Sequence, residues 1–483
     1  MNKNLTLLTD YFQLSMIQGY FLTKRCGKRV AFDLFYRRNP FSNGYAVAAG
    51  LAQAIEYIND LSFGEESVNY LRSLGTFDES FLEYLKTFKF TGDIHAIPEG
   101  TVVFPYEPLI RVTAPIIEAQ LIETALLNIV NHQSLIATKA ARVVHAAEND
   151  VVLEFGLRRA QGPDAGVYGA RAALIGGCHA TSNVLAAQMF NLPPRGTHAH
   201  SWVMAFDTEL EAFREYAKLY PNACILLVDT YNTLKSGVPN AIKVFEEMRS
   251  NGVELKNYGI RLDSGDFAYL SKQARKMLDA AGFSNAAISA SGDLDENLIA
   301  LLKQQGAKIT VWGVGTNLIT SEGCPAFGGV YKLAAEENNG CMEPKIKISE
   351  NPEKVTNPGV KKIYRLYDKV SGKMKADLIT LDDETIDTNS DLTIFHPINT
   401  WKQMTLKAGE FTARELLVPI FLNGKQVYES PAVMDIRAYC AKEKETLWEE
   451  HKRLVRPHMM PVDLSHELWH LRKRMIDEIR GGV

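Results

Sequence analysis

The sequence contains no apolar run approaching the roughly 20 residues that a membrane-spanning helix needs. Asp10 also interrupts the N-terminal apolar stretch before it could form the core of a signal peptide. Neither sign of charge dominates, since 53 Lys and Arg face 57 Asp and Glu for a formal net charge of -4. This balance gives no reason to expect nucleic acid or an acidic membrane surface as a partner. We therefore expect a cytoplasmic protein that does not bind membranes.

Cysteine is also scarce and is not arranged in pairs. None of the six cysteines stands in CxxC spacing: Cys26, Cys178, Cys224, Cys324, Cys341 and Cys440. A disulfide framework or a structural zinc site needs closer or more regular spacing. We expect reduced thiols.

The length of 483 residues exceeds that of one typical domain, and 46% hydrophobic with 23% charged residues is an ordinary globular composition. We predict a mixed α+β N-terminal domain over residues 1–130, a catalytic α/β barrel-like domain over 131–335, and a C-terminal region of short strands and helices over 336–483. In the flanking regions, periodicity and Pro or Gly breaks predict helices at 9–18, 46–60, 117–147 and 430–480, and strands at 29–36, within 90–113 and at 361–367.

The middle of the chain alternates short apolar runs with helical stretches. The runs cover residues 151–155, 223–228, 258–262, 286–290 and 308–312. Such alternation predicts βαβ units around a parallel sheet, closed or partly closed as an irregular barrel.

Polar and glycine-rich segments follow each of these runs. They begin at Gly156, Asp229, Asp263, Ser291 and Gly313. In parallel α/β folds the loops at the carboxyl ends of strands form the active site. Asp, Ser and Gly are also ordinary turn and cap residues, so one such loop alone indicates little. Five in succession predict one polar cavity.

Two of these loops carry groups that suit anions. Gly313-Val314-Gly315-Thr316 follows a strand, and glycines allow backbone N–H groups to approach a phosphate closely. The turn lacks the third glycine of a dinucleotide fingerprint. Arg158, Arg159 and Arg261 offer bidentate guanidinium groups for a carboxylate or phosphate, unless they form structural ion pairs such as Arg261 with Asp263.

His198 and His200 form an HxH pair in the run Gly-Thr-His-Ala-His-Ser over 196–201. Three interpretations are open: zinc ligands of a metal-dependent barrel hydrolase, hydrogen-bonded structural histidines, or a phosphoryl acceptor. The next histidine is His396, which weakens the zinc hypothesis. Thr197 and Ser201 beside the pair can hydrogen-bond phosphate oxygens.

Seven stretches of the chain together resemble the nicotinate phosphoribosyltransferase family of the type II phosphoribosyltransferases. They are LTDYFQ at 8–13, GLRRAQGPD at 156–164, GTHAHS at 196–201, VDTY at 228–231, RLDSGD at 261–266, GVGT at 313–316 and VYKL at 330–333. The resemblance implies transfer of a phosphoribosyl group from phosphoribosyl diphosphate to nicotinate in NAD biosynthesis, coupled to ATP hydrolysis through a phosphohistidine.

The resemblance also implies roles for single residues. His200 would be phosphorylated, Arg261 would bind the nicotinate carboxylate, Thr197 would line the nicotinate pocket, and Thr316 with Gly313 and Gly315 would bind the phosphoribosyl phosphate. Phe12 stands where the family commonly has a tyrosine that stacks on the pyridine, so stacking is kept and the hydroxyl is lost. The resemblance further implies that the protein is a homodimer with shared active sites.

The chemistry of the transfer suggests further assignments. Arg158, Arg159 and Mg²⁺ would serve the diphosphate, with Asp263 and Asp293 as metal or ribose ligands, and Ser201, Ser291 and Gly292 would contact substrate. We expect His200, Arg261 and Asp263 to be the catalytic residues. Competing hypotheses are a nicotinamide or quinolinate phosphoribosyltransferase, the barrel hydrolase, and an inactive nucleotide-binding relative.

Overall fold

The computed structural model describes residues 4–399 and 401–481. Its described residues form two compact units. We call Ile136–Pro325 the barrel unit, and Met1–Leu135 together with Ala326–Val483 the terminal unit.

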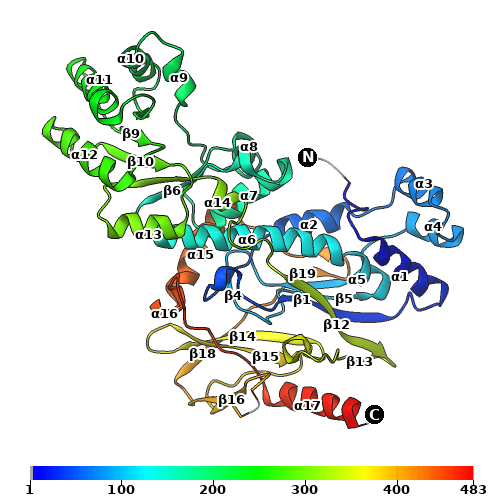
Figure 1. Ribbon diagram of the computed structural model, residues 1–483. Helices are drawn as coiled ribbons and strands as arrows, with labels where there is room; N and C mark the ends of the chain where they lie inside the picture. The colour runs from blue at the N-terminus through cyan, green and yellow to red at the C-terminus, as the bar shows by residue number, and fades with distance from the viewer. Residues whose placement is uncertain (1–3, 400, 482–483) are drawn as a thin grey trace. The chain divides into compact units, whose positions relative to one another are not determined.

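A six-stranded sheet with the order β7-β6-β11-β10-β9-β8 organises the barrel unit (Figure 1). Every pairing in it is parallel. The strands are β6 (Val151–Glu154), β7 (Ala180–Thr181), β8 (Cys224–Leu227), β9 (Tyr258–Leu262), β10 (Ala287–Ser291) and β11 (Val311–Val314). The predicted α/β class is confirmed, and five of the strands coincide with the five predicted runs, the last beginning three residues late. The two-residue strand β7 was not predicted, because it is too short to produce a pattern.

Helices between the strands complete the βαβ units of this sheet. They are α7 (Pro163–Gly176), α8 (Val184–Phe190), α10 (Glu209–Leu219), α11 (Val238–Ser250), α12 (Phe267–Ala280) and α13 (Glu296–Gln304). Asp266 caps α12 by accepting from the N–H of Tyr269, and Asp295 caps α13 by accepting from that of Leu298. Such caps start each helix directly after a strand-end loop. Strand residues such as Ile260, Leu262, Ala290 and Trp312 are buried, as expected of a sheet covered on both faces.

The described strand pairings leave the barrel open between β7 and β8. The connection between those two edge strands contains residues 194–198, and it is hydrogen-bonded to both strands. The N–H of Arg195 donates to the carbonyl of Thr181 in β7 at 2.9 Å. The N–H of Leu227 in β8 donates to Nε2 of His198 at 3.2 Å. The segment that begins the GTHAHS run therefore connects the two edges where a strand would otherwise close the barrel.

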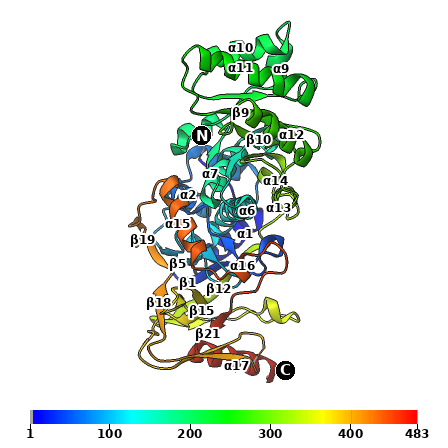
Figure 2. The same cartoon turned by 90° about the vertical axis from the view of Figure 1, so that its left-hand side faces the viewer.

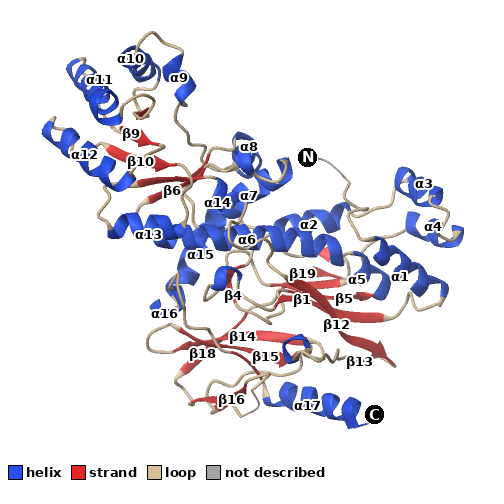
Figure 3. Cartoon of the chain, viewed as in Figure 1, coloured by secondary structure: helices blue, strands red, loops and turns tan. Residues whose placement is uncertain are grey.

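A seven-stranded sheet dominates the terminal unit, in the order β13-β12-β1-β5-β3-β19-β20 (Figure 3). Its strands are β1 (Arg29–Tyr36), β3 (Asp93–Ala96), β5 (Ile110–Pro115), β12 (Gly329–Asn338), β13 (Cys341–Pro344), β19 (Val418–Leu422) and β20 (Lys425–Gln426). β1 has the predicted bounds. Because β12 pairs with β1 and β19 pairs with β3, both ends of the chain contribute to one sheet.

The helices in the N-terminal part of the terminal unit precede or follow these strands. They are α1 (Tyr11–Leu22), α2 (Leu51–Asp60), α3 (Glu65–Ser73), α4 (Glu79–Lys86), α5 (Ile116–Leu121) and the start of α6 (Glu123–Ala147). The helix predicted over 46–60 begins only at Leu51, because Ala46–Val47 forms β2, which pairs with β4 (Val102–Val103). The predicted long helix is two helices, α5 and α6, interrupted at Ile122 without any proline or glycine.

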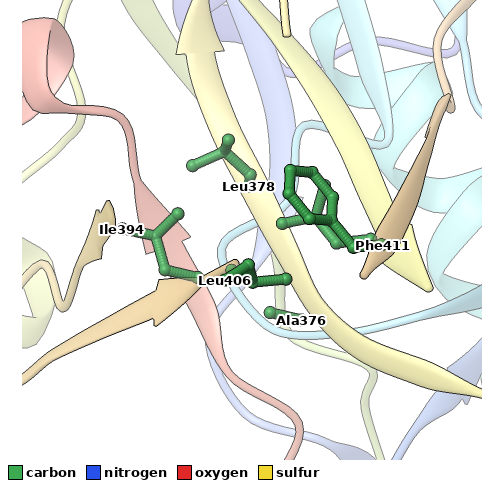
Figure 4. Packing of buried hydrophobic residues seen from close by; sticks show 6 residues of the cluster. Ala376, Leu378, Ile394, Leu406 and Phe411 are labelled. Atoms are coloured by element: carbon green, nitrogen blue, oxygen red, sulfur yellow. The ribbon is translucent and has the colours of Figure 1, made fainter. Parts of the chain in front are cut away.

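A second antiparallel-rich sheet, β17-β16-β21-β15-β14-β18, forms from residues 361–464. Its strands are β14 (Lys361–Asp368), β15 (Met374–Leu381), β16 (Leu392–Phe395), β17 (Gln403–Leu406), β18 (Phe411–Glu415) and β21 (Val462–Leu464). Figure 4 shows its core, in which Leu366, Ala376, Leu378, Ile394, Leu406 and Phe411 are buried together.

The helical prediction for residues 430–480 is correct only in part. α15 (Val433–Glu445), α16 (Glu449–Lys452) and α17 (His466–Gly481) are helical, but β21 interrupts them and pairs with β15. Figure 2 shows α17 beside β21. A three-residue strand held by tertiary pairing has too few positions to show an alternating pattern. No helix in residues 4–399 and 401–481 is long and apolar enough to span a bilayer.

Candidate active site

A cavity of about 490 Å³ lies at the carboxyl ends of the parallel strands in the barrel unit. Eleven of the residues predicted for the site line it: Arg158, Arg159, Thr197, Arg261, Asp263, Ser291, Gly292, Asp293, Gly313, Gly315 and Thr316. Six further lining residues were not predicted as site residues of the transferase, although His198 was a candidate in the zinc hypothesis: Phe155, Leu157, Ser182, Gly196, His198 and Ala199. Of these, Phe155 and Ser182 follow β6 and β7, so only the strand order could have indicated them.

The guanidinium of Arg261 is held firmly at the end of β9. Its Nη1 donates to the hydroxyl of Thr197 and, at 3.3 Å, to the carbonyl of His198. Its Nη2 lies 3.7 Å from Oδ1 of Asp263, and the side chain is 15% exposed. Burial lowers the pKa of Arg261, while Asp263 and Asp229 oppose that shift. An arginine with such a high intrinsic pKa remains a cation here, so the cavity contains a fixed positive charge.

Asp263 is the most connected carboxylate of the cavity. Its Oδ1 accepts a hydrogen bond from the Ser291 hydroxyl, and its backbone N–H donates to Oδ2 of Asp229 at 2.8 Å. The same Asp229 oxygen accepts from the Ser264 hydroxyl at 2.8 Å. Asp229 therefore supports the loop that carries Asp263. The other Asp229 oxygen, Oδ1, is buried and has no hydrogen-bond partner among the described residues.

His200 lies beside Asp263 and is not itself among the residues that line the cavity. It begins the short helix α9 (His200–Met204). Its Nδ1 is 3.1 Å from the Thr230 hydroxyl, and its Nε2 is 3.7 Å from Oδ2 of Asp263. The side chain is 40% exposed, so the ring is accessible to solvent. Ser201, the next residue of α9, is exposed and does not line the cavity.

His198 has a different environment from His200. Its ring is buried against Tyr216 at a centroid distance of 4.6 Å, and its Nε2 accepts from the N–H of Leu227. Burial lowers the pKa of His198 to about 4, so the ring is neutral at pH 7. Its Nε2 is thus engaged, which leaves no symmetrical HxH metal site. Within residues 4–399 and 401–481, no cluster of three or more His, Cys, Asp or Glu side chains could hold a metal ion. The structural interpretation is the appropriate one for His198.

Two glycines of the cavity are required by close packing. A Cβ on Gly313 would lie 2.6 Å from Cδ2 of Phe155, so this glycine makes room for an aromatic ring of the cavity wall. Gly292 has φ 104°, and a Cβ there would lie 2.5 Å from the carbonyl oxygen of Asp263. Asp293 follows with φ 46°. This left-handed turn directs the chain back toward Asp263.

Arg158 and Arg159 lie in the 3₁₀ turn Leu157–Arg159 after β6, and both side chains are exposed. Together with Arg261 they give the cavity three arginines, compared with two carboxylates, those of Asp263 and Asp293. A surplus of guanidinium groups favours an anionic ligand. Phe12 belongs to the terminal unit, where it lies on α1 and is 52% exposed.

The fold and the cavity define the class of this protein: an α/β protein with an open parallel barrel and an arginine-rich pocket at the carboxyl ends of its strands. Comparison with known families makes the assignment more specific. The nicotinate phosphoribosyltransferase (NAPRTase) family profile matches residues 151–374, its N-terminal domain profile 7–131 and its C-terminal domain profile 360–472. The chain belongs to the nicotinate phosphoribosyltransferase family.

Individual relatives extend over the whole chain. It is 49% identical over 482 residues to nicotinate phosphoribosyltransferase of Bacillus subtilis, covering 100% of this chain and 97% of that protein. It is 32% identical to the human enzyme of that name, with 96% and 95% covered. The crystal structure of human nicotinic acid phosphoribosyltransferase superposes with a TM-score of 0.83 at 29% identity, covering 97% and 99% of the two chains. A Pyrococcus furiosus nicotinate-nucleotide pyrophosphorylase, at 22% identity and a TM-score of 0.69, shares the fold over 92% of this chain and 96% of that one.

Proposed function

We propose that this chain transfers the phosphoribosyl group of phosphoribosyl diphosphate to nicotinate, forming nicotinate mononucleotide and diphosphate in NAD biosynthesis, with ATP as co-substrate. The observation that carries this proposal is that Arg261 and Asp263 line one arginine-rich cavity and that His200 lies beside Asp263. Membership of the family and relatives that cover the whole chain support it.

In this proposal Arg261 binds the carboxylate of nicotinate. A guanidinium held by Thr197 and the His198 carbonyl is already oriented, so little conformational entropy is lost on binding. The same requirement favours nicotinate over nicotinamide, since a neutral amide cannot form the charge-assisted hydrogen bonds that a carboxylate forms with the partly buried Arg261. Comparing turnover of the two bases tests this preference directly.

Other residues of the cavity would hold the ribosyl donor. Gly313, Gly315 and Thr316 would bind the 5-phosphate, Ser291 and Gly292 the ribose, and Arg158 with Arg159 the diphosphate. The carboxylates of Asp263 and Asp293 are oxygen donors that suit Mg²⁺, which commonly takes one or two carboxylates together with substrate phosphates. When bound, Mg²⁺ would neutralise charge on the departing diphosphate.

The transfer requires no strong general base from the protein. The pyridine nitrogen attacks the anomeric carbon with its own lone pair as the bond to the diphosphate oxygen breaks. Positive charge develops on the sugar, and the carboxylates of Asp263 and Asp293 would stabilise it. The residues of this chain thus act by orienting two anionic substrates and by placing negative charge near the ribose.

His200 would be the phosphorylated residue that couples ATP to this reaction. If the Thr230 hydroxyl accepts the Nδ1 proton, Nε2 carries the lone pair and faces Asp263. Nε2 then attacks the γ-phosphorus of ATP, the bond to the bridging oxygen breaks, and ADP leaves; water later hydrolyses the phosphohistidine. A phosphoryl group on Nε2 would add negative charge beside Asp263. This charge would alter the environment of a carboxylate proposed to act on the ribosyl donor.

Incubation with ATP and Mg²⁺ followed by mass spectrometry at neutral pH tests the mechanism. We expect an acid-labile phosphoryl group on the peptide containing His200. The variant His200→Ala should lose phosphorylation and stimulation by ATP while keeping slow uncoupled transfer. His466→Ala, which changes an exposed histidine of the terminal unit, is the matched control. Undiminished phosphorylation of His200→Ala would refute the assignment.

We further propose that the protein is a cytoplasmic homodimer with shared active sites. The exposed aromatic side chains of Tyr11 and Phe12 on α1 support an intermolecular role for this helix. Phe12 from one subunit would then stack on the pyridine bound in the other. Light scattering of the purified protein should give twice the mass of one chain, and Phe12→Ala should raise KM for nicotinate without changing that mass.

A further inference from the structure

The first turns of α17 carry a sequence pattern that the proposed transferase reaction does not use. The helix begins His466-Glu467-Leu468-Trp469-His470. Its two histidines stand four residues apart, so they share one face of the helix. Their ring centroids are 4.2 Å apart with an interplanar angle of 61°. Both residues are exposed, and His466 keeps 60% of its side-chain surface accessible.

Neighbouring side chains order both rings. Phe395 packs edge-on against His466 at 5.8 Å, and Trp469 packs edge-on against His470 at 4.9 Å. Trp469 in turn lies 5.5 Å from Phe395. Aromatic contacts of this kind restrict rotation of the rings, so less conformational entropy is lost when both rings bind one ligand.

Glu467 determines which nitrogen of His466 is available. Its Oε1 is 3.2 Å from Nδ1 of His466. A carboxylate in this position accepts a hydrogen bond from Nδ1, and this contact favours the tautomer whose lone pair is on Nε2. A carboxylate behind an imidazole is the arrangement that orients metal-bound histidines and raises their basicity.

We propose that His466 and His470 form a binding site for a late first-row divalent metal ion, such as Cu²⁺, Ni²⁺ or Zn²⁺, with water completing the coordination. Imidazole nitrogen suits these ions far better than Mg²⁺ or Ca²⁺. Two imidazoles sharing one metal at a bond length of about 2.0 Å have centroids roughly 4.5–5 Å apart. The observed centroid separation of 4.2 Å is close to that range.

The surroundings limit this site to modest affinity. The helix N-terminus carries partial positive charge, and Nζ of Lys473 lies 5.3 Å from the Trp469 ring, so both oppose a cation. Glu467 offsets part of that charge. Within the described residues no third His, Cys, Asp or Glu joins the pair. A hydrolytic zinc centre requires three protein ligands, so this site binds metal without catalysing hydrolysis.

Binding would have a structural consequence for the C-terminal sheet. The buried side chain of Leu468, between the two histidines, packs with Ile379 of β15 and Leu464 of β21. A metal that joins positions 466 and 470 crosslinks one turn of the helix on the opposite side of that contact. It therefore stabilises the docked helix in proportion to its affinity for the folded state.

Fluorescence of Trp469 provides the test, because Cu²⁺ and Ni²⁺ quench a nearby indole. Titration of the full chain with CuCl₂ or NiCl₂ should show one saturable quenching step, and calorimetry should give a matching stoichiometry of one. His466→Ala/His470→Ala should abolish that step, and Glu467→Gln should weaken it roughly 10-fold. Trp469→Phe should remove the optical signal and keep the calorimetric one.

Two results would overturn the proposal. One is the absence of any saturable step in the wild-type protein, and the other is an unchanged step in the double histidine variant. Both histidines are exposed, so the variants should fold normally, and an unchanged melting temperature without metal verifies this. His200→Ala serves as a control, since it should leave the metal titration unchanged even if the transferase proposal is wrong.

Discussion

The guanidinium of Arg261 illustrates how a single side chain depends on its contacts. Three groups hold it: the Thr197 hydroxyl, the His198 carbonyl and the Asp263 carboxylate. Its Nε is buried and has no hydrogen-bond partner in the part of the chain that the structure describes. A ligand carboxylate would give this cation its closest anionic partner.

Replacing Arg261 by Ala should therefore affect nicotinate more than the ribosyl donor. Loss of the charged partner of a bound carboxylate costs about 2–5 kcal/mol. This cost is obtained from the ratio of kcat/KM for nicotinate between the wild-type protein and the variant. Arg159→Ala, at an exposed position of the same cavity, should instead raise KM for phosphoribosyl diphosphate. An unchanged KM for nicotinate in Arg261→Ala would exclude Arg261 from this role.

His198 and His200 show the limit of sequence reasoning at single residues. Both histidines stand in the same short run with similar small neighbours, so the sequence pattern does not distinguish their environments. The structure separates them because the N–H of Leu227, distant in sequence, donates to His198, whereas His200 contacts Thr230 and Asp263. No local pattern encodes contacts with residues so distant in the sequence.

At the scale of elements, the end of β11 contains a glycine, Gly313, that packing requires and for which binding is proposed. Gly313 was predicted for close approach of a phosphate, and the structure adds that the ring of Phe155 occupies the space of its missing side chain. The two requirements reinforce one another, since a side chain at this position would disturb the cavity wall as well as the turn.

Gly313→Ala should consequently reduce both stability and activity. The added Cβ at 2.6 Å from Phe155 forces the ring to move, and overpacking of this kind costs about 1–3 kcal/mol. Urea denaturation and the KM for phosphoribosyl diphosphate measure the two effects. Gly196→Ala is the matched control, because it lines the same cavity and its Cβ would meet nothing within 4 Å. Equal effects of the two variants would contradict the packing argument.

Strand β21 contains a buried carboxylate that should make stability depend on pH. Burial raises the pKa of Asp463 to about 6, and its Oδ1 has no hydrogen-bond partner among the described residues. Between pH 4 and 6 the Asp463 carboxyl is protonated in the folded state but already ionised in the unfolded state. The free energy of unfolding therefore falls as pH rises through this window, and above pH 6 the folded state contains an ionised buried carboxylate.

Asp463→Asn should remove this cost. We expect the free energy of unfolding at pH 7.5 to rise by about 1–3 kcal/mol, with little change at pH 4, as measured by urea denaturation across that range. Asp391→Asn provides the contrast, since Lys407 lowers the pKa of the exposed Asp391 and neutralising it should not stabilise the protein. Destabilisation by Asp463→Asn at pH 7.5 would show that the carboxylate has a partner that stabilises its charge.

At the scale of the whole molecule, segments distant in sequence are joined by sheets and by buried ion pairs, of which the network around Arg365 is one. Arg365 on β14 donates to Asp377 on β15 at 2.6 and 2.9 Å and to Glu443 on α15 at 3.0 Å. Arg365 and Asp377 are fully buried, and Glu443 nearly so. The network connects β14, β15 and α15, which span about 80 residues of the terminal unit.

Arg365→Met should destabilise the terminal unit strongly. It leaves the buried carboxylate of Asp377 without its charged partner and removes the cation beside Glu107 and Glu443, although Glu443 keeps Arg414. Breaking a buried ion pair in this way typically costs about 3–5 kcal/mol. Arg38→Met removes an arginine of the same unit whose pairing with Glu353 is exposed, and it should cost much less. Urea denaturation of both variants compares the two ion pairs, and similar losses would indicate that the buried network contributes no more than a surface pair.

The sequence alone determined the local features of this protein. Apolar runs and helical periodicity predicted the parallel strands, β1 and the α/β class, because backbone preference and burial on a sheet operate within a few residues. Polar strand ends predicted one cavity, since parallel strands end at one edge. The family resemblance rested on seven motifs and was confirmed by profiles covering most of the chain.

Only the tertiary structure decided the features that depend on contacts between distant residues. These are the opening of the barrel between β7 and β8, the sheet shared by both ends of the chain, the break at Ile122, the support of Asp263 by Asp229, and the different environments of His198 and His200. Each depends on hydrogen bonds or packing with partners distant along the chain. Short-range patterns contain no information on which partners folding brings together.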